Sequence, residues 1–243
     1  MNATRDPANE HIDQTILKVL KPLYRTGIAY HDYKVVGFEH VPQQGPGLVV
    51  FNHSLATYDI FLFGAKVYVE KKRLIASLAD RLIFKTPGLR QLALALSSVQ
   101  GEPHMARALL EAGRLVGVAP GGMREALRPS HQKYQLSWER RFGFAKLAIE
   151  AQVPVFLAAC PLADDLFTVL DTPLTRFVYE RFRAPLPVAF GLGLLPRPIA
   201  LTTYLSAPIQ PPRSDGAEPS HELIGQFHGQ LVERMNELMQ QGV

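Results

Sequence analysis

Short, wholly apolar runs alternate along this chain with longer segments in which apolar and polar residues recur at helical spacing. Gly47–Phe51 (GLVVF) and Val153–Ala159 (VPVFLAA) are the clearest apolar runs. Runs of this length without polar alternation are typical of strands that are covered on both faces of a sheet. Strands that alternate with helical segments favour an α/β fold, in which helices pack against the sheet.

The same patterns predict one α/β domain over residues 1–243, with a mixed, mostly parallel sheet and helices on both faces. Pro208–Pro219 is rich in proline, serine and glycine, but it is short, so we expect a loop there and no domain linker. The strands are predicted at Tyr33–His40, Gly47–Phe51, Leu74–Leu78, Arg114–Ala119, Val153–Ala159 and Pro198–Ser206, and the helices at 12–26, 60–70, Pro87–Leu96, Glu102–Glu111, Phe142–Ala151 and 219–240.

Residues 12–26 carry an apolar stripe at helical spacing, with cations on the other faces. Two interpretations stay open: a helix over residues 12–30 that lies at a membrane surface, and an ordinary amphipathic helix that faces the core. Pro22 removes a backbone hydrogen bond, so we expect the helix to kink or restart there. The stripe contains Ile12, Ile16, Leu20, Leu23 and Tyr24, and the cations are Lys18, Lys21 and Arg25.

Composition indicates a folded domain in a reducing compartment. Of the 243 residues, 47% are hydrophobic and 20% are charged, which excludes disordered and collagen-like chains. Cys160 is the only cysteine, so the chain can form neither an intramolecular disulfide nor a cysteine-based zinc site. Residues 1–15 hold no apolar signal segment, and no run reaches the roughly 20 apolar residues that span a bilayer. We therefore expect a protein that is dissolved or lies on a membrane without crossing it.

Positive charge is concentrated in the middle of the chain. The formal net charge is +4, yet residues 63–141 hold 14 Lys and Arg against 6 Asp and Glu. A basic segment suits an anionic lipid surface or a phosphate-bearing co-substrate, and an ordinary solvated surface is the plainer interpretation. No nucleic-acid partner is expected, because zinc-finger spacing, an aromatic RNA-binding signature and a dense basic arm are all missing from the sequence.

A histidine and an aspartate follow the apolar strand Gly47–Phe51. Loops at strand ends are where catalytic groups gather in α/β sheets. His53 can accept a proton from a hydroxyl, and Asp59 can fix the tautomer of the ring through its other nitrogen. The pair suits the activation of a bound alcohol; the plainer alternative is a helix-capping aspartate and a hydrogen-bonded structural histidine. Ser54 does not lie in a nucleophile elbow, since the positions two residues before and after it are not glycine.

A second loop follows the predicted strand Arg114–Ala119. It contains Pro120, Gly121 and Gly122, and the two glycines let the backbone approach a ligand and point N–H groups at an anion or a carbonyl oxygen. The Gly-Lys-Ser/Thr of a P-loop is missing, and a plain strand-to-helix turn is the alternative.

In their order along the chain, these motifs resemble the glycerolipid and lysophospholipid acyltransferase superfamily, which includes the bacterial lysophosphatidic acid acyltransferases. The likeness covers residues 33–210, and the ordered set is far more specific than any one motif. His53 and Asp59 resemble the family's His…Asp motif, and Pro120–Leu127 (PGGMREAL) resembles its third block. The other matching segments are Gly37–Pro42, Gly45–Phe51, Ala79–Gly88, Val153–Val155 and Leu195–Ile209.

Two departures from the usual family pattern point in one direction. Five residues instead of four separate His53 from Asp59, and the third block reads Ala-Pro-Gly-Gly where phosphate-acceptor members carry Phe-Pro-Glu-Gly. Both departures are similar to the branch that contains the diacylglycerol acyltransferases. The second block's phosphate-binding arginine has no counterpart near Val99–Glu102. The resemblance therefore favours a neutral lipid or a lysolipid as the acceptor.

The resemblance implies an O-acyltransferase of lipid and phospholipid biosynthesis. It would move a fatty acyl group from acyl-coenzyme A or acyl carrier protein to a lipid hydroxyl, directly and with neither a metal nor another cofactor. His53 would be the general base, and Asp59 would orient it. Glu125 would hold its loop by pairing with a basic group, and Arg124 and Arg141 would contact anions. The residues expected to bind substrate or support its loop are Asn52, Pro120, Gly121, Gly122, Arg124, Glu125 and Arg141.

A lipid substrate also implies a location and leaves two rival functions. We expect a cytoplasmic protein bound peripherally to the inner face of the membrane, because the acceptor is a lipid and the donor carries a fatty acyl chain. One rival is a hydrolase of acyl thioesters or lipids, in which water replaces the alcohol. The other rival is a lipid-binding protein that has the same fold without the activity.

Overall fold

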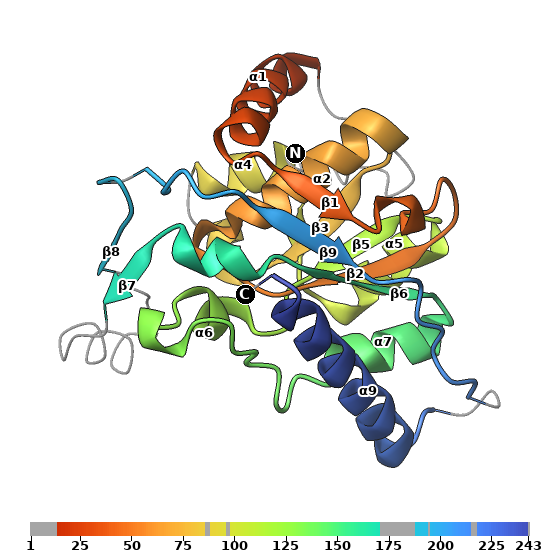
Figure 1. The fold of residues 1–243 in the computed structure, drawn as a ribbon. Helices are drawn as coiled ribbons and strands as arrows, with labels where there is room; N and C mark the ends of the chain where they lie inside the picture. The colour runs from red at the N-terminus through yellow and green to blue at the C-terminus, as the bar shows by residue number, and fades with distance from the viewer. Residues whose placement is uncertain are drawn as a thin grey trace.

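The main sheet of the described chain has seven strands in the order β1-β9-β6-β2-β5-β3-β4 (Figure 1). The computed structural model describes residues 14–85, 88–95, 98–170, 188–193, 195–214 and 218–242. The strands β6, β2, β5, β3 and β4 are parallel to one another, while β9 is antiparallel to β6 and parallel to β1. The predicted mixed, mostly parallel sheet is confirmed.

The elements keep the labels of Figure 1. The strands of the main sheet are β1 (Lys34–Val36), β2 (Gly47–Phe51), β3 (Ile75–Ala79), β4 (Val99–Gln100), β5 (Leu115–Val118), β6 (Val155–Ala159) and β9 (Thr202–Leu205). A separate antiparallel pair consists of β7 (Thr168–Leu170) and β8 (Val188–Phe190). The α-helices are α1 (Gln14–Tyr30), α2 (Tyr58–Lys71), α3 (Arg81–Lys85), α4 (Leu89–Ala95), α5 (Pro103–Glu111), α6 (Gly122–Ala126), α7 (Gly143–Ala151) and α9 (His221–Gln240).

The central strand β2 shows why its sequence has no polar alternation. Leu48 and Val50 belong to the apolar cluster that α5, α7 and α9 form on one face of the sheet. Val49 and Phe51 belong to the cluster on the opposite face, where α2 supplies the cover. All five residues of β2 are buried. Helices therefore cover both faces, as the apolar run predicts (Figure 1).

Parallel pairing also decides where the loops meet. In the register of the sheet, Val50 of β2 lies opposite Val118 of β5 and Leu157 of β6. Because the three strands run in the same direction, the segments that follow them leave the sheet side by side at one edge. The loop that carries His53 and the loop that carries the two glycines are thereby neighbours, although about 70 residues separate them in sequence.

Several predicted elements differ from the observed ones. The predicted strand Tyr33–His40 ends at Val36, because Gly37 turns the chain with φ +81 into a short 3₁₀ turn. A side chain at Gly37 would overlap the Leu205 carbonyl, so the turn requires glycine. The short elements α3, α6, β4, β7 and β8 were not predicted, since segments of two to five residues carry no readable periodicity.

The N-terminal helix differs from its prediction in two ways. α1 runs from Gln14 to Tyr30 as a single helix with Pro22 inside it, so the helix does not restart there, and the kink stays a prediction; residues 12 and 13 lie outside the described residues. Lys18 and Pro22 are both exposed, so water can reach the carbonyl that Pro22 leaves unpaired. The stripe also splits: Tyr24 is 6% exposed and packs inward, whereas Leu23 is 53% exposed.

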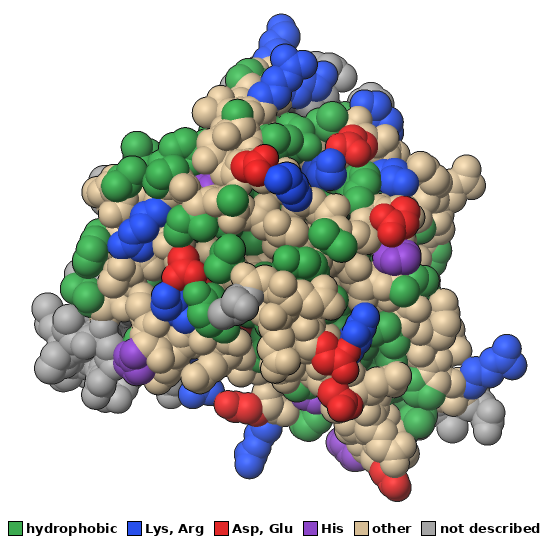
Figure 2. Space-filling model, viewed as in Figure 1, with side chains coloured by type: hydrophobic (Ala, Val, Ile, Leu, Met, Phe, Trp, Pro, Cys, Tyr) green, Lys and Arg blue, Asp and Glu red, His purple; other side chains and the backbone are tan. Residues whose placement is uncertain are grey.

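The outer side of α1 is basic. Lys18, Lys21 and Arg25 are all exposed, and Figure 2 shows basic side chains gathered at the top of the molecule, over this helix. A search of the helices that the structure describes finds none with the length and apolar character needed to cross a membrane.

Candidate active site

The site begins where β2 ends, with a buried asparagine. Asn52 is completely buried, and its Oδ1 accepts a hydrogen bond of 2.9 Å from the backbone N–H of Cys160. This bond joins the end of β2 to the end of β6 and so fixes the direction in which the chain leaves the sheet. The predicted contact of Asn52 with substrate stays a prediction; what the structure assigns to it is a brace beneath the loop.

One ring nitrogen of His53 contacts a backbone carbonyl, and among the described residues the other has no hydrogen-bond partner. Its Nδ1 lies 3.0 Å from the Ser54 carbonyl, and because a carbonyl can only accept, Nδ1 is the protonated nitrogen. Nε2 then carries the lone pair. Burial lowers the pKa of His53 below its usual value, and the positive charge of Arg128 lowers it further, against the opposing effect of the Ser54 bond. The ring is therefore neutral at pH 7 and chemically suited to accept a proton.

Asp59 lies on the first turn of α2 and contacts Ser54. Its carboxylate accepts a hydrogen bond from the Ser54 hydroxyl. In the part of the chain that the structure describes, no hydrogen bond joins Asp59 to His53, although the family motif leads us to expect one. Burial raises the pKa of Asp59 to about 7. Ser54, which is not part of the sequence motif, therefore contacts both the ring of His53 and the carboxylate of Asp59.

A tight turn separates the two residues of the motif. Leu55–Thr57 forms a 3₁₀ turn, and Thr57 adopts a left-handed backbone with φ 53 before α2 begins at Tyr58. Asp59 consequently lies inside the first turn of the helix, where its carboxylate also accepts from backbone N–H groups of its own helix.

Glu125 connects the two loops through the backbone. It is buried, and its Oε1 accepts a 2.7 Å hydrogen bond from the N–H of His53 while its Oε2 accepts one of 2.9 Å from the N–H of Ser137. Among the described residues its hydrogen-bond partners are backbone N–H groups, and the predicted basic partner acts on it through the positive charge of Arg128, which lowers the pKa of Glu125. Burial raises the pKa of Glu125, against the effect of these two bonds.

The two glycines before Glu125 have distinct reasons to be glycine. A side chain at Gly121 would overlap the Glu125 carboxylate, so any larger residue displaces the bridge. Gly122 has φ +55, which side chains other than glycine rarely adopt. Both requirements arise from the fold, and Gly122 lies in addition on the wall of the large cavity described below.

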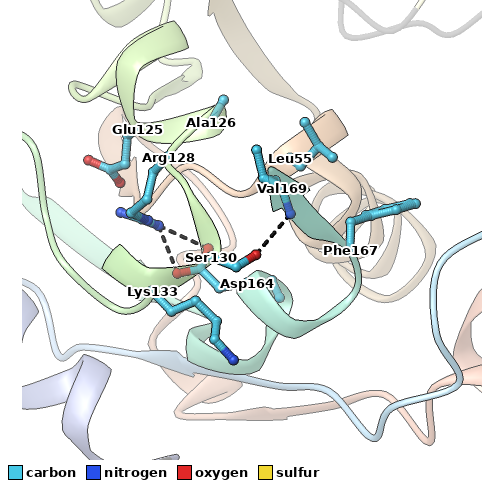
Figure 3. A pocket seen from close by; sticks show the side chains of 10 residues that line it. Leu55, Glu125, Ala126, Arg128, Ser130, Lys133, Asp164, Phe167 and Val169 are labelled. Carbon is cyan, nitrogen blue, oxygen red and sulfur yellow. Dashed lines mark hydrogen bonds and ion pairs between the residues drawn. The ribbon is translucent and has the colours of Figure 1, made fainter. Parts of the chain in front are cut away.

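A buried ion pair lies next to the loop that carries Glu125. Arg128 contacts both carboxylate oxygens of Asp164, at 2.9 and 2.8 Å, and Asp164 also accepts from the N–H of Tyr134 at 2.8 Å. Nearby, the Ser130 hydroxyl accepts from the N–H of Val169 (Figure 3). The cavity among these side chains has a volume of about 10 Å³, which suits about one water molecule. It is a support for the site and too small for a substrate.

A cavity of about 790 Å³ lies on the α2 side of the sheet. His53, Pro120 and Gly122 line it, and so do apolar side chains of α2 and β3. The apolar wall includes Phe51, Ile60, Phe61, Val69, Leu74, Ile75 and Leu78, and α1 adds Tyr24. A cavity of this size, largely apolar with a few polar groups, is typical of a small-molecule site.

Cations lie around the same cavity. Arg141, which the sequence analysis selected, lines it together with Lys21 and Arg81, which were missed as site residues. Arg124 is exposed and does not belong to this lining. Arg81 also lies 3.5 Å from Glu102. Of the missed residues, Ser54 adjoins His53 in sequence, whereas Arg128 and Asp164 carried no signal because their pairing spans 36 residues.

Comparison with known proteins shows the family to which this chain belongs. Residues 32–160 match the family described as Acyltransferase, and the chain belongs to that family. The solved lysophosphatidic acid acyltransferase PlsC of Thermotoga maritima has the same fold, with a TM-score of 0.58 and 20% identity over 97% of this chain and 84% of that one.

Relatives with a described activity are animal proteins. The chain is 35% identical over 181 residues to proteins of Bos taurus and Homo sapiens, each named "DGAT1/2-independent enzyme synthesizing storage lipids". The match covers 74% of this chain and 53% and 54% of those two. This chain therefore corresponds to about half the length of these relatives.

The Glu125 bridge makes the size of residue 121 critical. Gly121→Ala should lower the free energy of unfolding by roughly 1–3 kcal/mol, because displacing the carboxylate leaves buried N–H groups without a partner. Gly143→Ala is the matched control, since a side chain there meets nothing within 4 Å. Urea denaturation of both variants measures the difference. Equal stabilities would show that the bridge tolerates the displacement.

The raised pKa of Asp59 makes stability depend on pH. The folded state holds this proton more tightly than the unfolded chain, so the wild type should lose stability as pH rises from about 4 to above 7, by up to about 1.4 kcal/mol per pH unit. The Asp59→Asn variant has no titrating group at this position, so its stability relative to the wild type should rise over that pH range. Melting temperatures at pH 5 and pH 8 measure this gain, with the exposed Asp32→Asn as control. A constant difference between wild type and Asp59→Asn would contradict the prediction.

Proposed function

We propose that this protein transfers a fatty acyl group from a thioester to the hydroxyl of a lipid, with His53 as the general base. The observation that carries the proposal is a neutral histidine, with an unprotonated Nε2, on the wall of a cavity of about 790 Å³ that is otherwise largely apolar. Membership of the acyltransferase family supports it.

The proposed transfer is direct and forms no acyl-enzyme intermediate. Nε2 of His53 takes the proton of the acceptor hydroxyl, whose oxygen forms a bond to the thioester carbonyl carbon. The tetrahedral intermediate then breaks its carbon–sulfur bond, and the thiolate leaves with the proton from the imidazolium. Cys160 is an unsuitable nucleophile, because it is buried and burial raises the pKa of its thiol well above the ordinary value.

The loop of Pro120 and Gly122 is the proposed support for the developing negative charge. It lines the cavity beside His53, and Glu125 joins the two loops by accepting from the backbone N–H of His53. General-base catalysis supplies about 10²–10⁴-fold of rate enhancement, so orientation and electrostatic stabilisation must supply the remainder.

The apolar part of the cavity is the proposed site of the acyl chain. Each methylene removed from water contributes about 0.8 kcal/mol, so a chain of roughly 15 methylenes contributes about 12 kcal/mol before the costs of ordering it. Lys21, Arg81 and Arg141 also line this cavity, where they favour the phosphates of coenzyme A or of an acyl carrier protein's prosthetic group.

Two features favour a neutral glycerolipid as the acceptor. The relatives from cattle and humans are named as enzymes that synthesise storage lipids, although this chain covers only about half of them. The third block offers Gly121 where phosphate-acceptor members have an acidic residue, and the overlap of any side chain there with Glu125 ties this difference to the fold.

The proposed location is the inner surface of a membrane. α1 exposes Leu23 and three cations, and its last residue, Tyr30, donates a 2.9 Å hydrogen bond to the Pro196 carbonyl. Beside Pro196, Leu192 and Leu195 are 58% and 66% exposed. Figure 2 shows hydrophobic side chains along the left border of the molecule, where Figure 1 draws β8 and the segment after it. An apolar edge next to a basic helix suits an anionic leaflet.

This membrane surface is testable with vesicles. Leu192→Asp combined with Leu195→Asp should reduce co-sedimentation with vesicles of anionic phospholipid several-fold, because both side chains would leave the acyl region. Val36→Asp is the matched control: Val36 is 54% exposed, and it pairs with Tyr204 at the far end of β9 from this edge. Unchanged sedimentation of the double variant would exclude the edge as a membrane contact.

The proposed activity is testable with a labelled donor. Radiolabelled palmitoyl-coenzyme A is offered with liposomes and a panel of acceptors: lysophosphatidic acid, other lysophospholipids, monoacylglycerol, diacylglycerol and long-chain alcohols. A labelled lipid should form, and His53→Ala should lower its rate by about 10²–10⁴-fold. His131→Ala, which changes an exposed histidine, should leave the rate unchanged.

The other outcomes identify the rival functions. Labelled free fatty acid in place of a lipid product would indicate a hydrolase. The absence of any product from palmitoyl-coenzyme A and from palmitoyl-acyl carrier protein, together with retained binding of the donor, would indicate a lipid-binding protein.

A further inference from the structure

We infer that Asp59 positions His53 through Ser54 and not by contacting the ring. The inference rests on the proposed function for its kinetic part, because His53 must be the base for its orientation to affect the rate. Its structural part stands on three contacts that meet at Ser54.

Ser54 contacts both members of the motif with different atoms. Its backbone carbonyl accepts from Nδ1 of His53 at 3.0 Å, and its side-chain hydroxyl donates to the Asp59 carboxylate. Ser54 is 0% exposed, so no solvent competes for either bond. The bond to Asp59 limits the rotation of Ser54, and the direction of its carbonyl decides where the imidazole can lie.

The other side of the histidine is held as well. The N–H of His53 donates to Glu125 at 2.7 Å, so the peptide before the ring is fixed by one buried carboxylate. The peptide after the ring is the one whose carbonyl holds Nδ1, and the second buried carboxylate, Asp59, fixes that residue. Two acidic side chains thus clamp the backbone on either side of His53, and neither forms a hydrogen bond with its ring.

In this arrangement one group selects the tautomer of the ring and another fixes its orientation. In a direct histidine–aspartate pair, the carboxylate does both. The Ser54 carbonyl alone selects the tautomer with a free Nε2, and it is neutral. Asp59 needs only an acceptor oxygen for the Ser54 hydroxyl, so an amide in its place can still serve. In a direct pair the negative charge itself stabilises the imidazolium, and an amide there is severely harmful.

A set of four variants distinguishes the two arrangements. If Asp59 acts through Ser54, Ser54→Ala and Asp59→Ala each lower kcat by on the order of 10²-fold with KM unchanged, since a displaced base is costly and neither residue lines the cavity. The double variant is no worse than either single one, and Asp59→Asn keeps most of the activity. Ser206→Ala is the control, because it removes another buried serine hydroxyl bond, at 2.9 Å from the N–H of Leu157.

Two kinetic results would overturn the inference. A Ser54→Ala variant with nearly wild-type kcat, beside an Asp59→Asn variant as impaired as Asp59→Ala, would show that Asp59 acts on the ring directly. Losses that multiply in the double variant would show that the two residues act independently.

A spectroscopic measurement separates this inference from the proposed function. In the full chain labelled with ¹⁵N-histidine, the His53 ring signals are identified by their loss in His53→Ala. We expect the Nδ1–H tautomer in the wild type and in Ser206→Ala, and a mixture of tautomers in both Ser54→Ala and Asp59→Ala. A mixture in Asp59→Ala alone would overturn the inference, whether or not the protein transfers acyl groups.

Discussion

The bridge that Glu125 makes between two backbone N–H groups is the contact around which the site is arranged. A buried carboxylate is costly unless its oxygens accept hydrogen bonds, and Glu125 meets this requirement only when the His53 and Ser137 segments lie on either side of it. The same carboxylate occupies the space above Gly121, so that position has no room for a side chain. One interaction therefore fixes the histidine loop, the glycine turn and the loop before α7 together.

Burial shapes the chemistry of the site in a consistent direction. It lowers the pKa of His53 and raises the pKa values of Asp59 and Glu125, so each group is moved toward its neutral form. A site that opens onto an apolar cavity cannot hold several unpaired charges. The ion pair between Arg128 and Asp164 is the exception, and its two groups neutralise each other at 2.8 Å.

The fold and the family agree, while the spacing of the motif makes this chain distinctive. Membership of the acyltransferase family rests on the match over residues 32–160, and the PlsC structure shares the fold. The five residues between His53 and Asp59 include the left-handed Thr57, and Ser54 contacts both members of the motif.

The sequence by itself determined the α/β class, the buried central strands and the two loops that carry His53 and Gly121, because continuous apolar runs and glycine pairs are local signals. It also indicated the position of β2 and β6 to within about two residues.

Tertiary structure decided the rest. The partners of Glu125, the contact of Asp59 with Ser54 and the pairing of Arg128 with Asp164 each join segments or atoms that no spacing rule relates. Parallel pairing brings those segments to one edge of the sheet, and hydrogen bonds to buried carboxylates then choose their partners by geometry, which only the folded chain possesses.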